Sequence, residues 1–159
     1  MEGKRVRGFM TTFKYFISTW VITALFCLFA CDNDAQVDEL PPAVFADIVI
    51  DLGLPEYQNL TRDGGFVRLS QGLRGIILYR ENSTSYHAIE QNCTYLPFEA
   101  GSTADIDPNN PVLMRDPSCN SIFRLPDVFP SGGPAIIPLR KYSVNLNARI
   151  LTIMSEPIQ

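Results

Sequence analysis

The sequence predicts an all-β domain built from small antiparallel sheets or a partial barrel. Runs of β-branched and aromatic residues are short and are separated by turn residues, which is typical of strands in such folds. Twelve prolines and ten glycines occur among the 159 residues. They leave no uninterrupted stretch of about 12 residues with the apolar spacing of a helix.

Seven segments share the strand pattern: residues 44–50, 66–69, 75–79, 86–89, 102–106, 136–144 and 149–154. The turn before the second segment is marked by Asp63-Gly64-Gly65. The last two segments are expected to form a hairpin across Asn145-Leu146-Asn147. The chain shows no internal repeat and no second folded domain.

The first thirty residues have the pattern of a signal peptide. An apolar run from Tyr15 to Phe29 follows a basic segment and is shorter than the roughly 20 residues that a membrane-spanning helix needs. The run ends in Leu28-Phe29-Ala30-Cys31, which is similar to a lipobox, the motif that precedes a lipidated cysteine. This similarity implies a bacterial, exported lipoprotein held at a membrane by acyl chains on Cys31. An uncleaved anchor or an ordinary signal peptide is the alternative.

Residues 31–42 form an acidic segment without aromatic residues that ends in Pro41-Pro42. This composition predicts a tether that leads to a single domain over residues 43–159. The acidic residues after Cys31 resemble the export signals of surface lipoproteins in the Bacteroidetes, although a solvated linker has the same composition. The expected location is the outer membrane, on its periplasmic face or at the cell surface.

The mature chain is acidic. Removal of residues 1–30 takes away four of 13 basic and one of 17 acidic residues, which leaves 9 against 16 and a net charge of −7. The chain also lacks a clustered stripe of lysine and arginine. Nucleic acid is therefore excluded as a partner, because phosphate binding needs such a stripe.

Two loops each hold one of the two cysteines that remain in the domain. The first loop reads Asn92-Cys93-Thr94-Tyr95 and the second reads DPSCNSIF over residues 116–123, followed by GGPA at 132–135 and PLRKYSV at 138–144. In this order and spacing, residues 69–153 resemble the Rieske iron–sulfur domain family. In that family the loops carry Cys-x-His and Cys-Pro-x-His-Gly-Ser-x-Phe, and a Gly-Pro-Ala turn and a Pro-Leu-x-x-Tyr-x-Val strand close the fold.

The resemblance places the four cluster ligands at Cys93, Tyr95, Asp116 and Cys119. A Rieske centre uses two cysteines on one iron and two histidines on the other. Only Cys93 is of the expected type, since Cys119 stands in a histidine position and the other two are oxygen donors. The resemblance thus implies a Rieske-like domain that has lost its cluster and needs no metal or cofactor. The alternative is an electron-transfer protein with an atypical 2Fe-2S or iron centre on these residues.

The resemblance also implies that the two loops meet. Cys93 and Cys119 are then expected to form a disulfide, as paired cysteines of exported domains commonly do. The tip of the joined loops would present Tyr95, Leu96, Pro97, Phe98 and Asn120 to an envelope protein. The expected function is that of a non-enzymatic binding or structural module. A hydrolase or a carbohydrate-binding module is a weaker reading, because the sequence offers no nucleophile–base pair.

His87 is the one histidine of the chain. It lies six residues before Cys93, which is roughly 20 Å along a straight strand and too far for shared metal ligation. A partly buried or surface histidine is therefore expected. With one histidine, neither a histidine-based zinc site nor a Ser-His-Asp triad is predicted.

Overall fold

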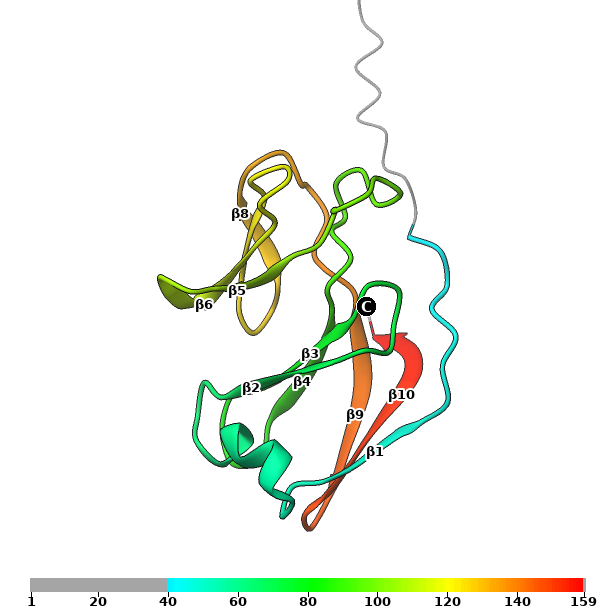
Figure 1. Cartoon of the computed structure of the whole chain (residues 1–159), viewed down its shortest axis with the longest axis vertical. Helices are drawn as coiled ribbons and strands as arrows, with labels where there is room; N and C mark the ends of the chain where they lie inside the picture. The colour runs from blue at the N-terminus through cyan, green and yellow to red at the C-terminus, as the bar shows by residue number, and fades with distance from the viewer. Residues whose placement is uncertain (1–39, 159) are drawn as a thin grey trace, which may run out of the picture. The chain divides into compact units, whose positions relative to one another are not determined.

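The computed structural model describes residues 40–158 (Figure 1). These residues form ten strands and one short 3₁₀ helix, η2, in the following order: β1 (Ile48–Asp51), η2 (Pro55–Thr61), β2 (Phe66–Leu69), β3 (Ile76–Arg80), β4 (Tyr86–Glu90), β5 (Asp105–Asp107), β6 (Asn110–Arg115), β7 (Ile122–Arg124), β8 (Phe129–Gly132), β9 (Lys141–Asn147) and β10 (Ile150–Ile158). The prediction of an all-β fold of small antiparallel sheets is confirmed.

The strands form a curled six-stranded sheet and a separate four-stranded sheet (Figure 1). The six-stranded sheet has the order β1-β10-β9-β4-β3-β2, and the small sheet has the order β5-β6-β7-β8. All strand pairs are antiparallel. In the chain, the four strands of the small sheet lie between β4 and β9. These two strands are neighbours in the large sheet and pair at two positions, Ala88 with Tyr142 and Ile89 with Lys141.

The two faces of the large sheet bury different apolar clusters. Ile77 and Tyr79 of β3 face a cluster that includes Met114 and Phe123 of the small sheet. The alternate residues of β3, Ile76 and Leu78, face a second cluster with residues of β1, β9, β10 and η2. Because side chains of a strand alternate between faces, β3 is buried on both sides, and this explains its continuous apolar run.

Several predicted strands are correct within a few residues. The segment 66–69 matches β2, and the segments 75–79 and 86–89 match β3 and β4 with shifts of one residue. The closing hairpin is present, but it turns at Ala148–Arg149 rather than at residues 145–147, since Asn147 pairs with Ile150. Ala148 has a φ of 54°, the left-handed conformation that such a tight turn requires.

The predicted signal peptide, the lipidation of Cys31 and most of the tether lie outside the described residues. At the start of the described part, Leu40 and Pro41 accept hydrogen bonds through their carbonyl oxygens from the Arg140 guanidinium, at 2.7 and 2.6 Å. The end of the predicted tether is thus bound to the domain. No helix in residues 40–158 has the length and apolar character needed to cross a membrane.

Candidate functional site

The first cysteine loop leaves the large sheet at the end of β4. Asn92 forms an isolated bridge with Thr103, and the Cys93 amide donates to the Ser102 carbonyl at 3.1 Å. The loop is tied further by Thr94, whose hydroxyl donates to the Ile137 carbonyl at 2.7 Å. These bonds fix Cys93 at the base of the loop, where its side chain is fully buried.

A buried carboxylate anchors the entry to this loop. Glu90 accepts hydrogen bonds from the backbone amides of Leu73, Arg74 and Asn92 and from the Tyr142 hydroxyl, at 2.6–3.1 Å. Burial, together with the Glu90 carboxylate, raises the pKa of Tyr142 above its ordinary value. The sequence did not point to Glu90, because three of its four donors lie 16, 17 and 52 positions away in the chain.

The second cysteine loop connects β6 and β7 and is held by Asp116. Its Oδ1 accepts hydrogen bonds from the Ser118 amide at 2.8 Å and from the Ser118 hydroxyl at 2.6 Å. The Asn120 amide donates to the Asp116 carbonyl, which closes the turn. Asn120 itself has a φ of 60°, a conformation that asparagine tolerates. An aspartate followed by proline, as in Asp116-Pro117, is typical of such a turn, since the aspartate carboxylate can accept from the amide two residues on.

The turn after β8 packs against the backbone of the second cysteine loop at Asn120 and Ser121. Gly133 has a φ of 79°, and a Cβ atom there would lie 2.5 Å from the Asn120 carbonyl oxygen and from the Ser121 Cα. The Ser121 hydroxyl accepts hydrogen bonds from the Ala135 amide at 3.2 Å and from the Cys119 thiol at 3.0 Å. The Gly-Gly-Pro-Ala segment therefore positions Cys119 through Ser121, a residue that sequence analysis did not single out.

The two loops bring Cys93, Asp116 and Cys119 together. One carboxylate oxygen and the two sulfur atoms all lie within 4.8 Å of one another. Cys93 and Asp116 are fully buried, and Cys119 is partly exposed. Asp116 Oδ2 is buried and has no hydrogen-bond partner among the described residues. Three of the four positions that the sequence resemblance named thus form one cluster.

The predicted disulfide between Cys93 and Cys119 is not formed in this structure. Both residues are free cysteines, and their sulfur atoms are 3.9 Å apart, whereas a disulfide bond measures about 2.05 Å. The sequence prediction correctly placed the two residues side by side. It did not include Ser121, which accepts the hydrogen bond of the Cys119 thiol.

The two thiols differ in environment. Burial raises the pKa of Cys93 to about 12, the Tyr95 backbone amide opposes this rise, and the neighbouring Asp116 and Cys119 add to it. A thiolate is the reactive form of cysteine. In reduced, metal-free protein, we expect iodoacetamide at pH 8 to alkylate Cys119 at least about tenfold faster than Cys93. Peptide mapping by mass spectrometry measures both rates, and equal rates would contradict the burial of Cys93.

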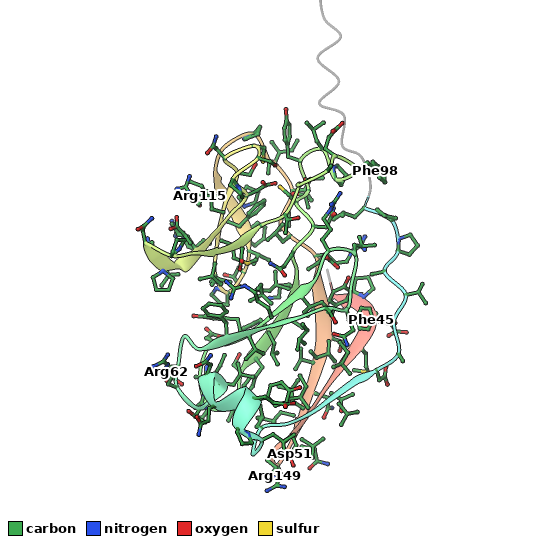
Figure 2. The ribbon with its side chains drawn as sticks, in the orientation of Figure 1. Phe45, Asp51, Arg62, Phe98, Arg115 and Arg149 are labelled. Carbon is green, nitrogen blue, oxygen red and sulfur yellow. The ribbon has the colours of Figure 1, made fainter. Side chains whose placement is uncertain are left out.

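The predicted binding tip is only partly exposed. Leu96 and Phe98 are 47% and 65% exposed, and Asn120 is also exposed, but Pro97 is buried. Tyr95 is half-buried and packs against the core between the sheets. Figure 2 shows Phe98 at the other end of the domain from the ion pair of Asp51, the last residue of β1, with Arg149 in the β9–β10 turn. The apolar surface of the tip is therefore formed by Leu96 and Phe98.

His87 lies outside the cluster. It pairs with Tyr79 at the start of β4, and its Nε2 is 2.9 Å from Glu81 Oε2 and 3.3 Å from the Ser85 hydroxyl. Hydrogen bonds from His87 and Ser85 lower the pKa of Glu81. The histidine therefore belongs to the β3–β4 turn rather than to the cysteine loops.

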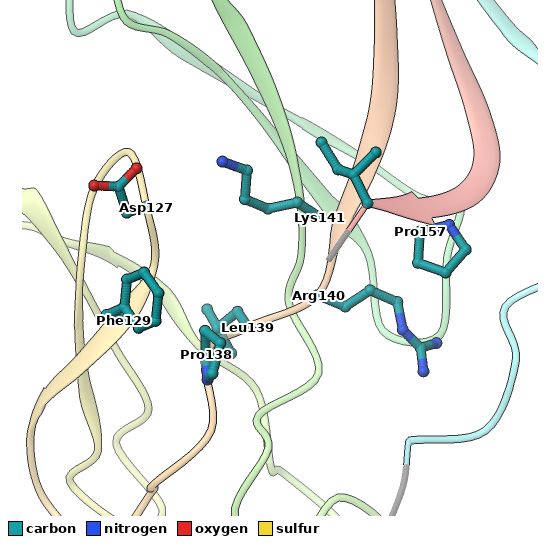
Figure 3. Close-up of a pocket in the computed structure, with 8 residues that line it drawn as sticks. Asp127, Phe129, Pro138, Leu139, Arg140, Lys141 and Pro157 are labelled. Atoms are coloured by element: carbon teal, nitrogen blue, oxygen red, sulfur yellow. The ribbon is translucent and has the colours of Figure 1, made fainter.

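A groove lies between the β7–β8 turn and the start of β9 (Figure 3). Lys141 extends toward the side of Asp127 and donates a long hydrogen bond to the Pro126 carbonyl at 3.5 Å, while Arg140 holds the Leu40–Pro41 segment. Within the described residues, the lining includes none of the predicted site residues. Arg140 and Lys141 thus both donate to backbone carbonyl groups of the domain.

No family model and no curated protein matches this chain. Among solved structures, one chain of the complex of reduced oxygenase and oxidized ferredoxin in carbazole 1,9a-dioxygenase is similar to it. The similarity covers 62% of this chain and 87% of that chain, with 19% sequence identity and a TM-score of 0.45. A similarity of this size does not establish a common fold. The β architecture described above follows from the strand pairings of this chain alone.

Proposed function

We propose that this chain is a membrane-anchored envelope lipoprotein whose Rieske-like domain has lost its iron–sulfur cluster and binds a protein partner through its loop tip. The single observation that carries the proposal is the convergence of the two cysteine loops at one end of the domain, with Leu96 and Phe98 exposed beside them. The lipobox-like segment before Cys31 supports the anchoring.

The clustered donors do not fit a Rieske cluster. That cluster needs two thiolates on one iron and two imidazoles on the other. Here the donors are two cysteines and the Asp116 carboxylate. The chain has one histidine, His87, and it is hydrogen-bonded to Glu81 at the opposite end of β4. The two cysteine loops therefore support a binding role better than electron transfer through a two-iron centre.

The exposed apolar residues of the tip favour a protein partner. Aromatic side chains are enriched among residues that dominate binding energy at protein interfaces. Phe98 stands on a loop that is fixed at its base by the bonds of Asn92 and Cys93. A loop that is already ordered loses less backbone entropy when its aromatic side chain is buried against a partner.

We expect Phe98→Ala to weaken partner binding at least about tenfold while changing the free energy of unfolding by less than about 0.5 kcal/mol. A photo-crosslinking amino acid at position 98 should trap an envelope protein in cells. The same residue at position 49 is the matched control, since Val49 is equally exposed at 65% but lies on the edge strand β1. Crosslinks of equal yield from both positions would contradict docking at the tip.

Metal and sulfide analysis of the purified protein tests the loss of the cluster. We expect neither acid-labile sulfide nor the visible absorbance of an iron–sulfur centre. Stoichiometric iron with sulfide would instead support the electron-transfer alternative on Cys93, Tyr95, Asp116 and Cys119.

A further inference from the structure

We infer that Cys93, Cys119 and Asp116 form a binding site for a single Zn²⁺ ion that joins the two loops. This inference goes beyond the proposed docking function and does not depend on it. It starts from the three donors that the loops gather within 4.8 Å of one another. Thiolate sulfur and carboxylate oxygen are both common zinc ligands.

The spacing of the two sulfur atoms fits a tetrahedral zinc ion. Two thiolates that each lie about 2.3 Å from a tetrahedral zinc ion are about 3.8 Å apart. The observed separation of the Cys93 and Cys119 sulfur atoms is 3.9 Å. An ion therefore fits between the two sulfur atoms as they stand, while a disulfide requires them to approach to about 2.05 Å. The Asp116 oxygen lies within 4.8 Å of the sulfurs and would move closer, to about 3.5 Å, to bind the same ion.

The Asp116 carboxylate uses only one of its two oxygen atoms in hydrogen bonds within residues 40–158. Oδ1 accepts both hydrogen bonds from Ser118, but Oδ2 is fully buried and has no hydrogen-bond partner in this part of the chain. Among the ion pairs of residues 40–158, none includes Asp116. A buried carboxylate without a cation is strongly disfavoured. A divalent cation beside the two sulfurs would supply the missing partner.

The site would keep one coordination position for solvent. Zinc sites with three protein ligands hold a water molecule or an external ligand in the fourth position, whereas structural sites use four protein ligands. The partly exposed Cys119 gives this site access to solvent. Ser121, which accepts the Cys119 hydrogen bond when the thiol is protonated, is placed to orient that sulfur around the ion.

The test is a metal titration of the full-length protein after reduction and removal of metal with a chelator. We expect one Zn²⁺ per chain by native mass spectrometry and a lowering of the Cys119 alkylation rate by at least about tenfold, because a metal-bound thiolate is shielded from reagent. Titration with Co²⁺ should give the absorption bands of a tetrahedral ion with thiolate ligands.

Three variants assign the ligands. Cys93→Ser and Cys119→Ser should abolish stoichiometric binding, and Asp116→Asn should weaken it at least about tenfold. Asparagine keeps an oxygen for the Ser118 bonds, so the loop is expected to remain folded. Asp63→Asn, at an exposed aspartate of another loop, is the matched control and should bind Zn²⁺ as the wild type does.

The wild-type titration decides the matter even if a variant fails to fold. Reduced protein that binds no ion, or that binds one without protecting Cys119, would overturn the inference. Binding that is unchanged in a folded Asp116→Asn protein would remove Asp116 from the site and overturn the three-donor assignment. None of these results bears on whether Phe98 contacts a partner, so the two proposals can fail separately.

Discussion

Replacement of Glu90 by alanine is expected to lower the free energy of unfolding by about 3–5 kcal/mol, a large share of the stability of a small domain. The substitution removes the acceptor of three backbone amides and of the Tyr142 hydroxyl in a fully buried place. Each buried donor left without a partner costs about 1–3 kcal/mol. Equilibrium unfolding in urea measures the change.

Two further variants distinguish this network from a general effect of removing acidic residues. Glu99→Ala, at an exposed position in the first cysteine loop, should change stability by less than about 0.5 kcal/mol. Tyr142→Phe removes one of the four donors and should cost about 1 kcal/mol. If Glu90→Ala were as mild as Glu99→Ala, the buried hydrogen bonds would not contribute as described.

Replacement of Gly133 by alanine is expected to cost roughly 3 kcal/mol and to displace the second cysteine loop. Part of this is the left-handed backbone conformation, which disfavours a Cβ atom by about 1–2 kcal/mol. The rest is steric, since the new Cβ would lie 2.5 Å from backbone atoms of Asn120 and Ser121. Thermal unfolding measures the first effect, and faster alkylation of Cys119 reports the second.

Gly64 provides a control with almost the same backbone conformation. Its φ is 78° against 79° at Gly133, but a Cβ atom there would have no neighbour within 4 Å. Gly64→Ala should therefore show only the conformational cost of about 1–2 kcal/mol and leave Cys119 unchanged. Equal losses of stability in the two variants would show that the close approach of Gly133 to Asn120 and Ser121 does not limit stability.

The sequence predicted the large sheet better than the small one. Strands β2, β3 and β4 have dense β-branched or aromatic runs between glycine or serine turns, and their positions were found within one residue. Strands β6, β7 and β8 were missed. β8 contains Pro130 and Gly132, which are typical of turns. Both are tolerated there because β8 is an edge strand with few ladder bonds to satisfy.

The sequence predicted that the two cysteine loops meet, but it did not predict the hydrogen bonds and burial of the donor atoms in them. Resemblance of the loop sequences placed Cys93, Asp116 and Cys119 near one another, and the structure groups them. Their chemistry depends on details that no local pattern carries. The unpartnered Oδ2 of Asp116 and the bond from Cys119 to Ser121 arise only when distant strands pack. The prediction of a disulfide lacked this information.

The pairing of β4 with β9, which involves only two registered positions, affects the order in which the chain folds. The β2–β4 half of the large sheet is built from neighbouring segments, whereas β4 and β9 pair residues as far apart as Ala88 and Tyr142, at positions 88 and 142 of the chain. Closing so long a loop carries an entropic penalty before its contacts form, and such distant pairings slow folding. The small sheet, with both cysteine loops, shortens this search if it forms first. The loops that gather the three donors would then also guide the assembly of the larger sheet.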